Sequence, residues 1–166
     1  MMDINKLFKD YKVKRFDEND VDEIYDFCLS NPYFYQMCGS DVSKQSIKND
    51  LKLLPDNIDI DNKYYLGIYD QDKLVCITDF LEKYPDDKTI FIGFFMVNGL
   101  FSNKGIGSNI INELMNSFKN LGYQYVRLAY DMDNPQSSYF WIKNGFVKIG
   151  EKKHEYGKMI IAQRKI

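Results

Sequence analysis

The sequence predicts a single α+β domain in which a mixed, mostly antiparallel sheet carries helices on both faces. Short apolar runs follow one another closely in the middle of the chain, and helical periodicity precedes and follows them. A chain of 166 residues with 45% apolar and 28% charged residues can bury one sizeable core. No repeat or low-complexity linker divides residues 1–166, so we expect one domain with the element order βααβββαβαββ.

Two helices are expected in the N-terminal third, after a short first strand at 13–16. The first helix covers about 20–28, where an Asn or Asp can cap its start and apolar residues recur at helical spacing. It stops at 31–32, because the residue before a proline disfavours the helical conformation. A second helix covers 43–53, and the aromatic stretch 33–41 between the two is expected to be irregular.

Three closely spaced strands follow at 64–69, 74–82 and 89–98. Short turns separate them, which indicates an antiparallel meander. The third run, TIFIGFFMVN, is almost continuously apolar, as expected of a strand that is covered on both faces.

A long helix and three shorter elements complete the expected order. The long helix covers 105–121, where one face is apolar, and a glycine ends it. A strand is expected at 125–131, and an Asn-Pro pair opens a short helix at 134–144. The last element is a hairpin over 146–165 with its turn at 155–157.

Charge and composition exclude several classes of function. The net charge is −2 and the basic residues are scattered, so no electrostatic footprint for nucleic acid is present. A short basic cluster at 12–15 is followed by acidic residues and is interpreted as a solvated surface patch. No apolar run reaches the roughly 18–20 residues of a membrane span, and the N-terminus lacks the apolar stretch of a signal peptide. We therefore expect a cytoplasmic protein without a membrane partner.

The chain contains few residues that could form a metal site or a disulfide. The three cysteines, Cys28, Cys38 and Cys76, are widely spaced, and His154 is the one histidine. A zinc site would need closely paired cysteines or histidines, and a disulfide framework would need an even number of cysteines. We expect no metal, and each cysteine is interpreted as a small buried hydrophobic residue.

The segment SNKGIGS at 102–108 has the pattern of an anion-binding turn. It joins an apolar strand to the long helix, and Gly105 and Gly107 let a ligand approach the main chain closely. The first N–H groups of the helix have no partner within it, and the helix dipole adds partial positive charge there. A pyrophosphate suits such a site, and Lys104 adds a direct charge. The alternative is a tight turn without a ligand.

The order of strand, glycine turn, long helix, strand and Asn-Pro helix resembles the GNAT N-acetyltransferase superfamily. The signature turn of the superfamily, (R/Q)xxGx(G/A), corresponds to 102–107, where both glycines match and Ser replaces the usual Arg or Gln. A second block, NxxAxxxYxxxGF, corresponds to 134–146, where the Asn and the closing Gly-Phe match. The resemblance covers about 64–164 and implies a GNAT-like three-layer fold.

The resemblance also implies that acetyl-CoA binds as a co-substrate, without a metal. The strand segments 94–97 and 126–130 would diverge and admit the pantetheine arm, which would pair with the backbone of the first segment. The N–H groups of the glycine turn would bind the pyrophosphate, and the short helix would line the far wall. The implied cofactor-binding residues are Phe95, Met96, Val97, Asn103, Lys104, Gly105, Ile106, Gly107, Ser108, Asn134, Ser137, Phe140 and Lys143.

Acetyl transfer to an amine needs a base, because the nucleophile must be neutral. A lysine-like amine of pKa about 10.4 is neutral in only about one molecule in 2,500 at pH 7. Asp79, which interrupts the apolar strand LVCITDFLE, is the first candidate for the base, and Glu82 and Asp131 are weaker ones. Strand alternation offers the alternative that Asp79 faces solvent.

The acid that would protonate the leaving thiolate has several candidates. In many family members it is a tyrosine seven residues after the helix-opening asparagine, but here that residue is Trp141, which is not a proton donor in this role. Ser137 and Ser138 lie one turn earlier and can hold a water, Tyr130 is another candidate, and a thiol of pKa about 8.5 can leave unaided. The catalytic candidates are therefore Asp79, Ser138 and Tyr130.

The sequence thus predicts an N-acetyltransferase that moves the acetyl group of acetyl-CoA to a primary amine by direct transfer in a ternary complex. The acceptor is a small molecule or a peptide terminus, and the aromatic stretch 31–36 either shapes its pocket or belongs to the core. Because of Trp141, a non-catalytic acyl-CoA-binding module is the main alternative, and a partner-binding scaffold is a third. An aromatic content of 16% leaves apolar surface for a homodimer.

Overall fold

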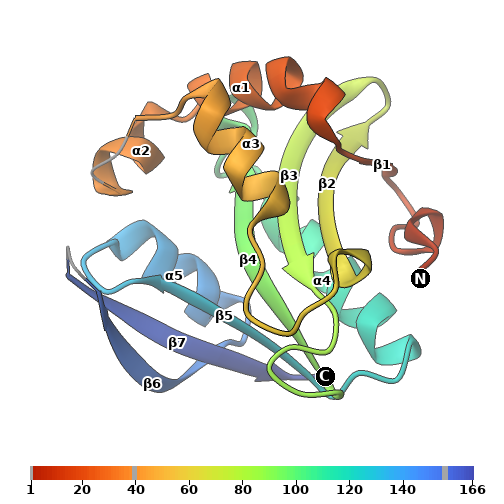
Figure 1. The fold of residues 1–166 in the computed structure, drawn as a ribbon, viewed down its shortest axis with the longest axis vertical. Coiled ribbons are helices and arrows are strands. Elements are labelled where there is room, and N and C mark those ends of the chain that lie inside the picture. Colours follow the sequence, from red (N-terminus) through yellow and green to blue (C-terminus); the bar gives the residue numbers. More distant parts are fainter. Residues whose placement is uncertain (1, 39–40, 155–156) are drawn as a thin grey trace.

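A central seven-stranded sheet organises the computed structural model, which describes residues 2–38, 41–154 and 157–166 (Figure 1). The strand order is β1-β2-β3-β4-β5-β7-β6. Neighbouring strands are antiparallel except β4 and β5, which are parallel, so the mixed, mostly antiparallel sheet is confirmed. The strands are β1 Lys12–Arg15, β2 Lys63–Asp70, β3 Lys73–Leu81, β4 Thr89–Val97, β5 Tyr125–Asp131, β6 Val147–His154 and β7 Gly157–Lys165.

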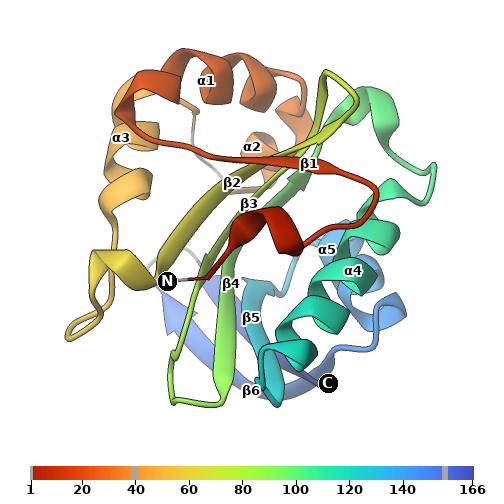
Figure 2. The same ribbon diagram turned by 90° about the vertical axis from the view of Figure 1, so that its right-hand side faces the viewer.

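Helices cover both faces of the sheet (Figure 2). On one face lie α1 Val21–Leu29 and α3 Lys44–Lys52, and on the other lie α4 Ile106–Asn120 and α5 Pro135–Lys143. The remaining helix, α2 Pro32–Cys38, lies beside α1 on the side of the molecule where α5 is found (Figure 1). The predicted α+β fold class is therefore confirmed.

The expectation of an irregular stretch at 33–41 is wrong over its first part, because α2 forms there. Pro32 occupies the first helical position, where its missing N–H forfeits no hydrogen bond, so one proline both follows the end of α1 and begins α2. The observed order is βαααβββαβαββ. Glu155 and Tyr156, at the expected hairpin turn, and the side chains of Cys38 and His154 lie outside what the structure describes.

The sheet separates two apolar cores. The stripe of α4 that includes Ile110, Leu114 and Phe118 packs into the larger core, which also contains the buried thiol of Cys76. The smaller core lies under α1 and α3 and contains the buried thiol of Cys28. Burial raises the pKa of both thiols, so these two cysteines pack as small hydrophobic residues.

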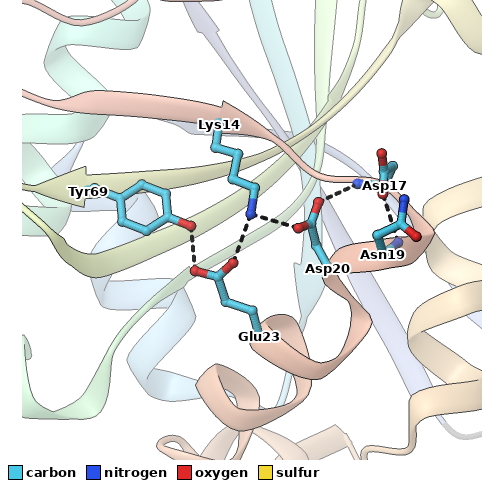
Figure 3. Close-up of polar contacts among 6 residues, drawn as sticks. All are labelled: Lys14, Asp17, Asn19, Asp20, Glu23 and Tyr69. Atoms are coloured by element: carbon cyan, nitrogen blue, oxygen red, sulfur yellow. Dashed lines mark hydrogen bonds and ion pairs between the residues drawn. The ribbon is translucent and has the colours of Figure 1, made fainter.

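Charged side chains attach the start of α1 to the edge of the sheet (Figure 3). The Lys14 ammonium of β1 lies 2.7 Å from Asp20 Oδ1 and 3.1 Å from Glu23 Oε2. Glu23 also accepts a 2.6 Å hydrogen bond from the Tyr69 hydroxyl of β2. The basic cluster at 12–15, interpreted from the sequence as a solvated patch, is therefore engaged in part with neighbouring carboxylates.

Glu82 links two elements on the opposite side of the sheet through its carboxylate. The Tyr64 hydroxyl of β2 donates to Oε2 at 2.8 Å, and the Tyr123 hydroxyl, just before β5, donates to Oε1 at 2.6 Å. Burial, with a further contribution from Glu82, raises the pKa of Tyr64 to about 12 and also raises the pKa of Tyr123. Both phenols therefore remain protonated in the folded protein above pH 10.

We expect the free energy of unfolding to fall between about pH 10 and pH 12, in part because of Tyr64. A folded-state pKa above the unfolded value contributes stability that is complete below the unfolded pKa of about 10 and is lost as the pH rises through the folded pKa. Urea unfolding of the wild type from about pH 8 to pH 12 should show this decline, and Tyr64→Phe should make it shallower. An equally steep decline in Tyr64→Phe would contradict the assignment.

Candidate functional site

β4 and β5 pair along only part of their length. Residues 89–92 of β4 lie opposite 125–128 of β5, whereas β4 continues as far as Val97. Beyond Ile92 the two strands diverge, so the two halves of the sheet separate (Figure 1). The V-shaped opening between β4 and β5 is called the fork below. The end of β4 therefore presents an edge of main-chain N–H and C=O groups that β5 does not cover.

A bulge in β4 marks the point where the fork begins. The register against β3 shifts from Asp79 opposite Phe94 to Phe80 opposite Ile92, so Gly93 is the extra residue and has no partner in either neighbouring strand. Gly93 is exposed although it lies within a central strand. The bulge thus places a small, uncovered residue at the base of the fork.

A cleft of about 470 Å³ lies between the end of β4, the start of α4 and α5. The structure brings most of the sequence-predicted cofactor residues together along its walls. These are Phe95, Met96, Val97, Asn103, Gly105, Ile106, Gly107, Ser108, Asn134, Ser137, Phe140 and Lys143. Lys104 is not part of the lining, and its ammonium lies 5.6 Å from the centroid of the Phe101 ring.

The turn before α4 is built around two glycines with different roles. Gly105 is the N-cap and has φ of 81°, a left-handed conformation that glycine adopts without strain. A Cβ on Gly107 would lie 3.0 Å from Val97 Cγ2 and 3.1 Å from Phe140 Cε2, so glycine allows the helix to approach both walls. No side chain caps α4, and its first N–H groups remain available to a ligand.

The opposite wall is the start of α5 and an aromatic cluster behind it. Asn134 caps α5 by accepting a 3.0 Å hydrogen bond from Ser137 N. The Phe140 ring stacks on Phe95 of β4 at a centroid distance of 5.6 Å. Trp141 is 7% exposed and makes edge contacts with both of these rings, so the residue at the usual tyrosine position also packs into the core.

The lining of the cleft is nearly free of charge. Among the described residues that line it, Lys143 is the only one with an ionised side chain at neutral pH. The partial positive charge of the α4 N-terminus acts in the same space. The cleft therefore suits an anionic ligand better than a polycation.

Asp79 lies at the base of the fork, on the face of the sheet that α3 covers, and does not face solvent. It is 8% exposed, and its Oδ2 accepts a 2.6 Å hydrogen bond from the Lys63 ammonium, while its buried Oδ1 has no partner among the described residues. Burial raises the pKa of the Asp79 carboxyl, although Lys63 opposes this shift. Lys63 also donates a 3.0 Å hydrogen bond to the Leu53 carbonyl at the end of α3.

The other two catalytic candidates lie on α5 and β5. Ser138 is half-buried in the first turn of α5, where its N–H bonds to the Asn134 carbonyl. Tyr130 is 8% exposed and belongs to the larger core. Neither of them, nor Asp79, lines the cleft as described.

Several residues of the site were not predicted from the sequence. Gln136 and Tyr139 of α5 line the cleft, and Tyr139 does so although it is 70% exposed. Gly93 could have been found, since an isolated glycine in an apolar strand often marks a bulge. Nothing in the sequence pointed to a role for Lys63, because a single basic residue at the start of a strand is common. The aromatic stretch 31–36 contributes to the cleft through its first residues. Asn31, Tyr33 and Phe34, at the start of α2, belong to the lining.

Neither a metal site nor a membrane span is found in the described part of the chain. No three His, Cys, Asp or Glu side chains there gather into a group that would hold a metal ion. None of its helices has the length and apolar character required to cross a membrane.

Comparisons with known proteins agree with the resemblance drawn from the two motif blocks. The model of the acetyltransferase (GNAT) family matches residues 2–146. An acetyltransferase from Thermus thermophilus superposes with a TM-score of 0.78 at 13% identity, over 94% of this chain and 97% of that one. No curated protein sequence matches the chain at a significant level.

Two other solved structures are similar. One is a Salmonella typhimurium acetyltransferase that modifies the N-terminal serine of a 50S ribosomal subunit protein, with a TM-score of 0.75 at 17% identity over 96% and 97% of the two chains. The other is a ribosomal α-N-protein acetyltransferase in complex with coenzyme A, with a TM-score of 0.71 at 17% identity over 96% of each chain. At these identities the likeness shows the shared fold. Because the family model spans most of its length, this chain belongs to the acetyltransferase (GNAT) family of acyltransferases.

Proposed function

We propose that this protein is an N-acetyltransferase that moves the acetyl group of acetyl-CoA directly to a primary amine in a ternary complex. The observation that carries the proposal is the cleft in the fork between β4 and β5, which ends at the uncapped first turn of α4. An uncovered strand edge and free helical N–H groups suit a molecule that has both an amide-containing arm and a pyrophosphate. Coenzyme A has both.

The two ends of the cleft suit different parts of the cofactor. The open edge at Phe95–Val97 would pair with the amides of the pantetheine arm, as an added strand would. The turn from Asn103 to Ser108 would bind the pyrophosphate through its N–H groups, and Lys143 would add positive charge near the nucleotide phosphates. The solved complex of a similar fold with coenzyme A supports this proposal.

The acceptor is a primary amine on a small molecule or a peptide terminus. An α-amino group, with a pKa of about 7.7–8.0, is neutral in roughly one molecule in ten at pH 7, so it needs less help from a base than a lysine amine does. The Salmonella acetyltransferase of similar fold, which modifies an N-terminal serine, supports a peptide terminus.

In the reaction, Asp79 would accept a proton from the acceptor ammonium. The neutral nitrogen then attacks the thioester carbonyl carbon, the carbon–sulfur bond breaks, and the thiolate leaves with the electron pair. The proton lost from the new amide goes to the thiolate, by way of Tyr130 or of a water held near Ser137 and Ser138. A thiol of pKa about 8.5 is also a fair leaving group without an acid.

A non-catalytic acyl-CoA-binding module is the second candidate. It is favoured by Trp141 at the position of the usual acid and by the absence of Asp79, Ser138 and Tyr130 from the described cleft lining. Micromolar binding of acetyl-CoA without acetylation of any amine in a broad panel would support the module over the enzyme.

A single added charge tests the proposed cofactor site. Ser108→Glu places a negative charge in the first turn of α4, and we expect it to weaken acetyl-CoA binding at least tenfold by repelling the pyrophosphate. Asn116→Glu is the matched control, because residue 116 is exposed in the same helix and away from the cleft. Calorimetric titration measures both affinities. Equal affinity in the two variants would place the cofactor elsewhere.

Variants of Asp79 and of its partner Lys63 separate a catalytic from a structural role for Asp79. Asp79→Asn should lower kcat by about 10²–10⁴-fold, because the base is lost. Lys63→Gln keeps the base but removes the charge that lowers the pKa of Asp79, so its maximal rate should persist while the acidic limb of its kcat/KM profile moves to higher pH. If both variants were merely less stable, with an unchanged kcat per folded molecule, Asp79 would be structural only.

A further inference from the structure

Gly93 leaves an unfilled position directly beside the proposed base. A Cβ built on Gly93 would lie 3.6 Å from Asp79 Oδ2 and 3.9 Å from Asp79 Oδ1, and its three nearest atoms all belong to that carboxylate. The side chain of Asp79 retains 12% exposure, and Gly93 itself is exposed. A small group that entered this position would therefore contact the carboxylate without displacing the protein.

The carboxylate is able to accept a further hydrogen bond. Its Oδ2 is paired with Lys63, but its buried Oδ1 has no partner in the described part of the chain. A buried acceptor without a donor costs free energy, and the cost is larger for a charged group. A cationic or amine donor placed over Gly93 would recover part of this cost.

The position over Gly93 is reached from the side of the sheet away from the proposed cofactor. Its Cβ direction points toward Asp79, on the face that carries α1 and α3, whereas α4 and α5 lie on the other face (Figure 2). Beyond β4 on that first face, none of the described helices covers β5, β7 or β6 (Figures 1 and 2). An acceptor can thus approach from this face while acetyl-CoA enters from the other.

We propose that Gly93 is the specificity-determining residue for the acceptor, because its missing side chain leaves the space in which the acceptor amine meets Asp79. This inference rests on the proposed acetyltransferase function and adds the route of the second substrate. A larger side chain at residue 93 would therefore exclude an acceptor with bulk next to the nitrogen before it excludes a small one.

The test enlarges residue 93 without disturbing the fold. Gly93 does not have a positive φ, and an alanine methyl would make only ordinary van der Waals contacts, so Gly93→Ala is compatible with the strand. Gly93→Val adds a β-branched side chain of the kind that strands favour. The control is Gly150→Val, at a register shift of the outer strand β6, where a Cβ would meet nothing within 4 Å. Acetyl-CoA affinity is measured by calorimetry, and turnover is measured with the hexapeptide SAAAAA and with methylamine.

We expect Gly93→Val to lower kcat/KM at least tenfold for the hexapeptide and less for methylamine, while acetyl-CoA affinity stays within about twofold of wild type. Gly93→Ala should give a smaller loss, and Gly150→Val none. Unchanged kcat/KM in Gly93→Val, or a parallel loss of acetyl-CoA affinity, would overturn the proposal. So would a wild type that binds acetyl-CoA but acetylates neither amine. A wild type that does not bind acetyl-CoA would instead refute the proposed function itself.

Discussion

The separation of β4 from β5 after Ile92 is the constraint on which the rest of the site depends. A strand in the middle of a sheet normally has both edges paired, and leaving main-chain groups unpaired away from water is costly. Two main-chain carbonyls in this stretch of β4 accept hydrogen bonds from side chains. The Thr78 hydroxyl donates to the Phe94 carbonyl at 3.0 Å, and the Asn31 amide donates to the Val97 carbonyl. The groups that remain form a ready edge for an extended ligand.

The buried pair of Lys63 and Asp79 stabilises this opened sheet from one side. Lys63 connects Asp79, at the bulge of β4, to the Leu53 carbonyl at the end of α3, so the pair joins the base of the fork to the helical layer. Removing one member of such a pair typically costs about 3–5 kcal/mol, because the other charge remains buried. The activity of an Asp79 variant must therefore be expressed per folded molecule, because the substitution also lowers the stability of the protein.

Much of the fold and of the cleft lining could be predicted from local sequence, because those features depend on neighbours in the chain. The glycine turn at Gly105 and the Asn134 cap are set by backbone geometry that specific residue types favour. The ion pair of Lys63 with Asp79 could not be predicted, since it joins residues on two strands through the register of the sheet. The helix α2 was missed because the proline that ends one helix also suits the start of another.

The aromatic cluster behind α5 has a practical consequence for optical spectroscopy. Trp141 is the one tryptophan of the chain, and its ring lies 5.6 Å from Phe95 and 5.0 Å from Phe140, both on the walls of the cleft. Indole emission from this protein therefore originates at a single location, against the surfaces that a bound cofactor would touch. The native chain thus carries its own fluorescent reporter of cleft occupancy, with no engineered label.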